Sequence, residues 1–239
     1  MVFLVTLSML AIFSTVCHCS DADFYETFFD EPSDTGSRNA LRLAAYKWPN
    51  GIVPYLFDDS SCDQKYQATV LDAMSVLEQA SCVLFIPKTD EQVEHIRFTK
   101  SKLGCGSSIG YRPDQREPLD VVLDDFCLSL PGAVQHELLH VLGLFHEHTR
   151  PDRDEYVEVL WDNIMPEFRQ NYHKGSYDYM ETFGLPYDYR SVMHYPTYAF
   201  ARPGTTETMV SRQNRSAELG QTDAASPLDL EKIRRMYEC

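Results

Sequence analysis

The chain has 239 residues, of which 44% are hydrophobic and 24% are charged. This composition is typical of a folded globular protein, and it excludes a disordered chain, a collagen-like repeat and a polytopic membrane protein. Acidic residues outnumber basic ones by 36 to 21, which gives a formal net charge of −15. Because such a charge repels phosphate, it argues against nucleic acid as a partner.

Residues 1–19 are predicted to form a signal peptide. Residues 2–16 are an apolar run that is shorter than the roughly 20 residues needed to span a bilayer as a helix. The run leads into Cys17-His18-Cys19, which fits a small-x-small cleavage pattern and is followed by a polar residue. The alternative is an uncleaved anchor. A signal peptide implies secretion into an oxidising compartment, where downstream cysteines form disulfides.

Residues 20–38 differ in composition from the rest of the chain. They contain six acidic residues, a cluster of aromatic residues and a single base, Arg38. This segment lacks the length for a core of its own, so we interpret it as a short propeptide that is removed by cleavage after Arg38. The remaining residues, 39–239, can bury one good core, which a cleft could divide into two lobes.

Hydrophobic periodicity and turn residues predict the elements of this domain. In chain order they are a helix over 64–81, strands over 83–86, 95–98, 107–111 and 119–123, a central helix over 130–145 and a last helix over 228–236. Ser129 is the expected N-cap of the central helix, with Pro131 in its first turn. Pro227 opens the last helix. Beyond residue 150 the chain is rich in Pro, Gly, Asn and Tyr and is expected to be irregular.

The central helix contains a metal-binding pattern. His136 and His140 are four residues apart, so both imidazoles lie on one helical face and can bind one Zn²⁺. Glu137 can then act as a general base over the metal. The alternative, a surface helix with two solvated histidines, is weakened by Gly143 and His146. The glycine can end the helix and turn the chain so that His146 reaches the same ion. Three histidines leave one position open, as in catalytic zinc sites.

The sequence from His136 to His146 resembles the long zinc motif of the metzincin proteases. Its continuation over 147–154, the segment Ser191-Val192-Met193-His194-Tyr195 and the pair Asn39-Ala40 resemble the astacin family in particular. The resemblance covers essentially all of 39–239. It implies an α+β fold, namely a two-lobed metzincin-like catalytic domain. The N-terminal lobe would have a twisted mixed sheet and two long helices, the C-terminal lobe would be rich in loops, and the active-site cleft would lie between them.

The resemblance implies that the protein is a secreted zinc endopeptidase, with one Zn²⁺ per chain bound by the three histidines. Glu137 would activate the zinc-bound water, which hydrolyses the peptide bond. Met193 would form an apolar floor under the histidines, and Tyr195 would donate a hydrogen bond to the oxyanion. Without the zinc motif, both residues would be interpreted as core packing. Glu147 would contact the amino terminus that cleavage creates at Asn39, or alternatively be a solvated glutamate.

Five cysteines remain after the signal peptide. The family pattern implies disulfides between Cys82 and Cys239 and between Cys105 and Cys127. Cys62 is then left over, as a free thiol, an intermolecular bridge or a partner of Cys19.

Latency in the family comes from a propeptide aspartate in a Phe-x-Gly-Asp segment. This chain has Phe28-Phe29-Asp30-Glu31 without the glycine. Asp30 is the candidate zinc-binding switch and Asp34 the second choice.

Residues 104–110 occupy the position at which the family has an edge strand above the cleft, so an extended polypeptide substrate is expected to pair with it. Gly106 and Ser108 are small, which predicts a roomy non-primed side. Arg202 could favour acidic residues after the scissile bond, although a surface arginine is the simpler interpretation. Asn214 begins a glycosylation sequon. We expect a monomer without a membrane anchor or recruiting modules.

Two other classes of function compete with the protease. One is a catalytically dead, astacin-like binding protein, which the presence of Glu137 and Tyr195 argues against. The other is a secreted protein with a structural zinc, which would need a closed site with four ligands. Only three histidines are expected to converge here.

Overall fold

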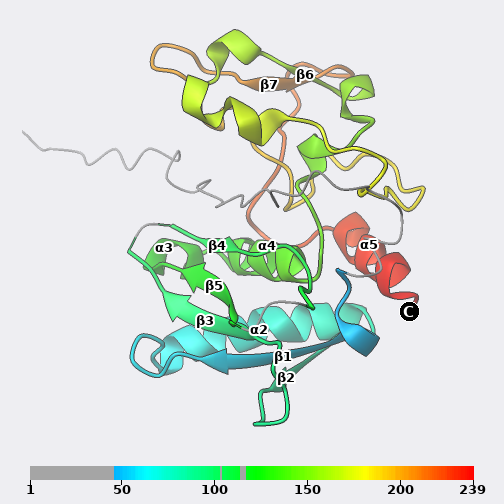
Figure 1. The fold of residues 1–239 in the computed structure, drawn as a ribbon. Helices are drawn as coiled ribbons and strands as arrows, with labels where there is room; N and C mark the ends of the chain where they lie inside the picture. The colour runs from blue at the N-terminus through cyan, green and yellow to red at the C-terminus, as the bar shows by residue number, and fades with distance from the viewer. Residues whose placement is uncertain (1–45, 103, 114–116) are drawn as a thin grey trace, which may run out of the picture.

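The computed structural model describes residues 46–102, 104–113 and 117–239 (Figure 1). The predicted signal peptide 1–19, the propeptide 20–38 and the start of the catalytic domain at Asn39 lie outside these residues. Within the described part of the chain, no helix combines the length and apolarity needed to cross a membrane.

A five-stranded sheet organises the first half of the described residues, in the order β2-β1-β3-β5-β4. The strands are β1 (Ile52–Phe57), β2 (Leu84–Pro87), β3 (Ile96–Lys100), β4 (Gly106–Ser107) and β5 (Leu119–Leu123). All neighbours pair in parallel except β4, which pairs antiparallel with β5. The sheet is therefore mixed, as predicted, and β4 is an outer strand. The strand predicted over 107–111 is much shorter than expected, and β1 was not predicted.

Helix α2 (Gln64–Ala80) packs against the central helix α4 (Pro131–Val141), and Figure 1 shows both beside the sheet. The Asp63 side chain caps α2 by accepting a hydrogen bond from the Tyr66 N–H. The buried residues of α2 recur at helical spacing and form one apolar face: Tyr66, Val70, Ala73, Met74 and Leu77. Residues 132–141 of α4 are buried on all sides, so this helix runs through the core.

The N-cap predicted for the central helix is wrong. Ser129 is not its N-cap, because Ser129 ends the short helix α3 (Asp125–Leu128) and donates its hydroxyl hydrogen to the Phe126 carbonyl. The N-cap of α4 is Leu130, which makes no side-chain capping bond, and Pro131 lies in the first turn as predicted.

Helix α4 also ends earlier than residue 145, at Val141. Gly143 has a φ of +106°, a left-handed conformation that favours glycine. The Gly143 N–H bonds to the His140 carbonyl and the Leu144 N–H to the Leu139 carbonyl, which is the Schellman pattern of helix ends. A Cβ at residue 143 would lie 2.6 Å from Cε of Met236. The turn at Gly143 thus ends the helix as the sequence predicts.

The second half of the chain forms a separate lobe around its own core. Strands β6 (Val157–Val159) and β7 (Met209–Ser211) pair antiparallel there, at the top of Figure 1. The remaining regular structure consists of short 3₁₀ segments: Glu147–Thr149, Arg153–Glu155, Trp161–Asn163 and Pro166–Tyr172. Another 3₁₀ turn, Pro49–Gly51, precedes β1. Two clusters of buried apolar side chains, one for each half, agree with the predicted two-lobed α+β architecture.

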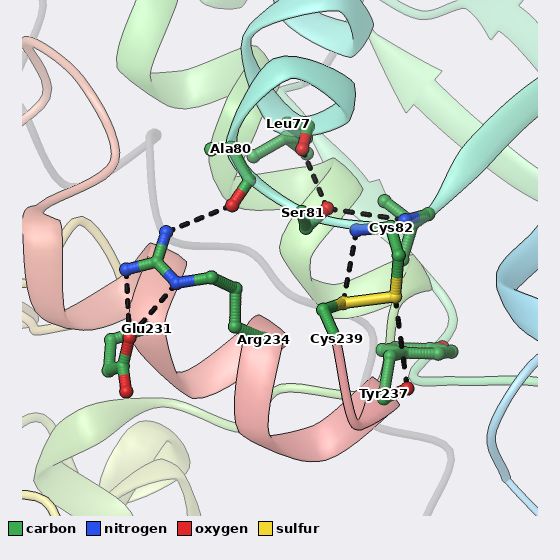
Figure 2. Close-up of a disulfide and its surroundings, with 9 residues drawn as sticks. Leu77, Ala80, Ser81, Cys82, Glu231, Arg234, Tyr237 and Cys239 are labelled. Atoms are coloured by element: carbon green, nitrogen blue, oxygen red, sulfur yellow. Dashed lines mark hydrogen bonds and ion pairs between the residues drawn. A yellow bond between two sulfur atoms is a disulfide. The ribbon is translucent and has the colours of Figure 1, made fainter.

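Helix α5 (Pro227–Tyr237) returns the chain to the first lobe, and a capping box between Ser226 and Asp229 begins it. A disulfide joins Cys82, just after α2, to Cys239 (Figure 2). Beside it, the Arg234 guanidinium donates to the Ala80 carbonyl at 2.9 Å.

The second disulfide joins Cys105 and Cys127, so both pairings implied by the resemblance are present. Among the described residues, Cys62 is the free cysteine. It is buried and its thiol donates to the Phe98 carbonyl at 3.3 Å. Cys19, one of the suggested partners, lies outside the described residues.

Removing the Cys82–Cys239 disulfide should lower stability, because this bond joins residues that are 157 positions apart in the unfolded chain. We expect the double variant Cys82→Ser/Cys239→Ser to lose about 2–5 kcal/mol of unfolding free energy. Urea denaturation followed by circular dichroism would measure this. Cys62→Ser is the control, since it removes a buried thiol and leaves both disulfides intact. An equal loss in the two variants would contradict this role of the disulfide.

Candidate metal centre and active site

Three histidines from two segments converge at the end of α4. His136 and His140 lie one helical turn apart, and the turn at Gly143 brings His146 to the same point. Their candidate ligand atoms all lie within 4.8 Å of one another. The residues are 8%, 1% and 1% exposed, respectively. The structure therefore brings together the three ligands that the sequence predicts.

The hydrogen bonds of the histidines fit a metal site. Nδ1 of His136 donates to the Val192 carbonyl at 2.8 Å, and Nδ1 of His140 donates to the Leu144 carbonyl at 2.7 Å. Each bond fixes the tautomer and leaves Nε2 as the electron-pair donor. Nε2 of His140 is buried and has no hydrogen-bond partner among the described residues. Burial, and then the charge of His136, lowers the pKa of His140, so it stays neutral as a ligand must. Neutral imidazole nitrogens suit Zn²⁺.

Glu137 lies next to the first histidine and is 3% exposed. The described metal-ligand cluster includes the three histidines and not this carboxylate, which fits the role of a base rather than a ligand. Burial raises the pKa of Glu137, while the neighbouring His136 and a hydrogen bond from Ser107 lower it. The Ser107 hydroxyl donates to Oε2 of Glu137 at 2.7 Å. Ser107 was predicted only as part of a strand, and its contact with Glu137, 30 residues away in the chain, was not predicted.

Met193 and Tyr195 are both fully buried. Met193 belongs to the core of the first lobe and Tyr195 to the core of the second. The Tyr195 ring lies 4.8 Å from that of His146 and stacks on His148 at 4.0 Å, measured between ring centroids. The phenol ring is therefore held beside the third histidine, and its role in the reaction stays a prediction.

Asp229 of α5 supports the segment that contains Met193. Its carboxylate accepts from the Ser191 hydroxyl at 2.6 Å and from the Val192 N–H at 2.9 Å. The carbonyl of Val192 in turn accepts from His136. The orientation of the first histidine thus depends on a buried carboxylate from the last helix. Sequence reasoning missed this residue, although the capping box Ser226-x-x-Asp229 was readable.

Glu147 is 1% exposed and is surrounded by donors. It accepts from the Lys232 ammonium, from the Arg150 guanidinium at 3.0 Å and from the Asp188 N–H at 3.0 Å. Burial would raise the pKa of this carboxyl, but Lys232 and Arg150 together hold it below its ordinary value of 4.5. The alternative of a solvated glutamate is wrong. Asn39, the expected partner, lies outside the described residues, and the contacts with Lys232 and Arg150 were not predicted.

Three further expectations concern the surface and the propeptide. Asn214 is exposed, as a glycosylation site requires. The Arg202 guanidinium donates to the Asp162 carbonyl at 3.1 Å, which agrees with a surface arginine. The propeptide candidates Asp30 and Asp34 lie outside the described residues. A second group of possible ligands, Cys105, Asp124 and Cys127, is not a metal site, because its cysteines form a disulfide.

Comparison with known proteins assigns the chain to a family. The family model for astacin, which describes a family of peptidases, matches residues 40–238. The chain belongs to the astacin family. Its cofactor is accordingly zinc, for which the three histidines provide the site.

Curated relatives of this astacin domain come from several animals. The chain is 36% identical over 213 residues to low choriolytic enzyme of Oryzias latipes, covering 85% of this chain and 74% of the relative. It is 36% identical over 208 residues to seminal metalloprotease 1 of Drosophila melanogaster, covering 85% and 82%. Zinc metalloproteinase nas-14 of Caenorhabditis elegans is also 36% identical, over 84% of this chain. The chain spans only 40% of that relative, so some relatives are much longer.

A solved structure supports the fold. High choriolytic enzyme 1, a hatching enzyme zinc-protease from Oryzias latipes, superimposes with a TM-score of 0.73 at 29% identity. The match covers 82% of this chain and 96% of that structure. The two-lobed α+β fold is therefore that of an astacin-family metalloprotease.

Glu147→Gln should destabilise the protein at neutral pH, because it leaves the buried Lys232 and Arg150 charges facing a neutral amide. We expect a loss of about 3–5 kcal/mol at pH 7. The folded-state pKa of Glu147 is lowered, so its contribution is complete above about pH 4.5 and is lost as the pH falls through that lowered pKa. The difference between variant and wild type should therefore shrink in acid.

Urea denaturation of both proteins from pH 7 to pH 3 would measure this difference. The exposed Glu167→Gln is the control and should behave as wild type at every pH. Equal stability of Glu147→Gln and wild type at pH 7 would show that the buried charges contribute nothing.

Proposed function

We propose that the protein is a secreted zinc endopeptidase that hydrolyses internal peptide bonds of extracellular polypeptides. The convergence of His136, His140 and His146, with Glu137 beside them and outside the ligand cluster, carries this proposal. Membership of a peptidase family supports the same reaction. The names of two relatives, low choriolytic enzyme and seminal metalloprotease 1, support an extracellular setting.

The chain's own residues account for the proton transfers and the charge of the reaction. When bound, zinc supplies a Lewis acid that polarises the scissile carbonyl and lowers the pKa of water. Glu137 accepts the proton of the attacking water and later returns it to the leaving amine. Its raised pKa suits a group that must both take up and release a proton. The Tyr195 phenol, which has an O–H donor, would donate a hydrogen bond to the oxyanion. Met193 would form an apolar floor under the three histidines.

The substrate would bind as an extended strand in the cleft between the lobes. β4 is an outer strand of the sheet, and an extended substrate would pair with its second edge by β-augmentation. Gly106 and Ser108 present little side-chain volume there, which supports a roomy non-primed side. We therefore expect no preference for one type of substrate residue on the non-primed side.

Secretion and maturation form the second part of the proposal. Two disulfides support an oxidising compartment, and the exposed Asn214 supports glycosylation. Cleavage after Arg38 would release the propeptide. The new amino terminus at Asn39 would approach Glu147, which borders a cavity of about 30 Å³ together with His146 and Lys232. Lys232 and Arg150 already neutralise that glutamate, so the amino terminus would join an existing charge network.

Cleavage of casein tests the catalytic proposal. The form Asn39–Cys239 should degrade casein, while Glu137→Gln and chelator-treated wild type should be silent. Glu137→Gln should still contain one zinc per chain, because this carboxylate lies outside the ligand cluster. If folded, zinc-loaded wild type does not cleave casein, the result would instead favour a binding protein or a protease with a very narrow range of substrates.

Comparison of zymogen variants tests latency. Chain 20–239 with Arg38→Ala should cleave casein at least about tenfold more slowly than chain 39–239, because a propeptide carboxylate would bind the zinc in place of water. Asp30→Ala in that zymogen should restore activity, and Asp34→Ala is the matched control. Restoration by Asp34→Ala alone would transfer the switch to that residue. A fully active zymogen would exclude latency.

A further inference from the structure

We propose that Ser107 is a positioning residue for the general base, and that it couples the substrate-binding strand to Glu137. The inference rests on the proposed endopeptidase function and adds a residue to its active site. Ser107 ends β4 and is paired with Val121 of β5. Its main chain thus belongs to the sheet, while its side chain points to α4.

One hydroxyl group contacts Glu137 at two places. Oγ of Ser107 lies 2.7 Å from Oε2 and 3.0 Å from the main-chain oxygen of Glu137. A contact that joins the backbone and the carboxylate of the same residue restricts the side-chain torsions between them. Among the described residues, Ser107 is the side chain that hydrogen-bonds to this carboxylate. Oε1 is thereby left to receive the proton.

A second bond joins the same segments one helical turn further on. The Gly110 N–H donates to the His140 carbonyl at 2.9 Å. Gly110 has a φ of +67°, and a Cβ there would lie 2.7 Å from the Tyr46 carbonyl oxygen. Residues 107–110 are therefore fixed against the turn of α4 that contains the base and the second metal ligand. These two hydrogen bonds join the strand edge to the catalytic helix.

Burial makes the hydroxyl difficult to replace. Glu137 is 3% exposed and Ser107 is half-buried, so solvent cannot freely supply an equivalent donor. A hydrogen bond to an ionised carboxylate is stronger than one between neutral groups. Alanine at position 107 keeps the backbone that pairs with β5, and that would pair with substrate, and removes only the donor. Its effect should consequently fall on the chemical step rather than on substrate binding.

Kinetics of three variants test this role, in the zinc-loaded form that cleaves casein. Ser107→Ala should lower kcat on a fluorogenic peptide about 10- to 100-fold, the size expected for a lost hydrogen bond to a charged group, with KM nearly unchanged. Ser107→Thr keeps the hydroxyl on a strand residue and should restore most of kcat. Ser81→Ala is the matched control: Ser81 also donates to a helix carbonyl, that of Leu77 at 2.7 Å, but at the end of α2 (Figure 2).

Inhibitor affinity separates positioning from a general loss of structure. A peptide hydroxamate binds zinc and also hydrogen-bonds to a carboxylate beside the metal, whereas a peptide thiol relies on the metal. Ser107→Ala should weaken the hydroxamate about tenfold and leave the thiol unchanged, with zinc content and melting temperature as in wild type.

Each remaining outcome overturns the inference. Wild-type kcat in Ser107→Ala would show that the hydroxyl does not position the base. Equal weakening of both inhibitors, or loss of zinc, would show a structural role only, as would failure of Ser107→Thr to recover activity while folded. These results leave the endopeptidase intact, since wild type still cleaves the peptide. Silent wild type would instead overturn the proposed function and this inference together.

Discussion

The site depends on two backbone carbonyls that hold imidazole rings in place. Val192 and Leu144 accept the Nδ1 hydrogens of His136 and His140, so both Nε2 atoms face one point. One carbonyl lies just beyond the helix, where Gly143 makes the tight turn possible, and the other comes from the distant segment before Met193. Helical spacing brings the rings to one face, but these carbonyls determine which nitrogen each ring presents.

Two buried carboxylates hold the segments that carry the metal-binding histidines and their hydrogen-bond partners. Asp229 holds the segment around Val192, and Glu147, which directly follows the third histidine, binds Lys232 and Arg150. Isolated charges in these positions would be costly, and the structure supplies each with partners. The Glu147 N–H also bonds to the Met193 carbonyl at 2.8 Å. The polar network thus joins α5, the metal-binding turn and the second lobe at the place where the chemistry would occur.

The sequence predicted those parts of the protein that depend on local spacing. The zinc helix, the turn at Gly143 and most strand positions follow from periodicity and from the conformational freedom of glycine. Strand β1 was not predicted because Pro54 interrupts its apolar pattern. Strands β6 and β7 were not predicted because each is only three residues long. Serine is a common N-cap residue, yet Ser129 ends α3. Residue type alone does not show whether such a serine ends one helix or begins the next. Ser107, Asp229 and Lys232 meet their partners 30, 37 and 85 residues away, which no local pattern encodes.

The dependence of His136 on the last helix has a consequence for the order of folding. His136 and His140 of α4 are synthesised before α5 and can meet zinc before the chain is complete. The carbonyl that orients His136 is fixed by Asp229, which is synthesised long after that histidine. The Cys82–Cys239 bond that secures α5 likewise requires the end of the described chain. The set of hydrogen bonds that orients His136 can therefore be completed only after synthesis has reached α5.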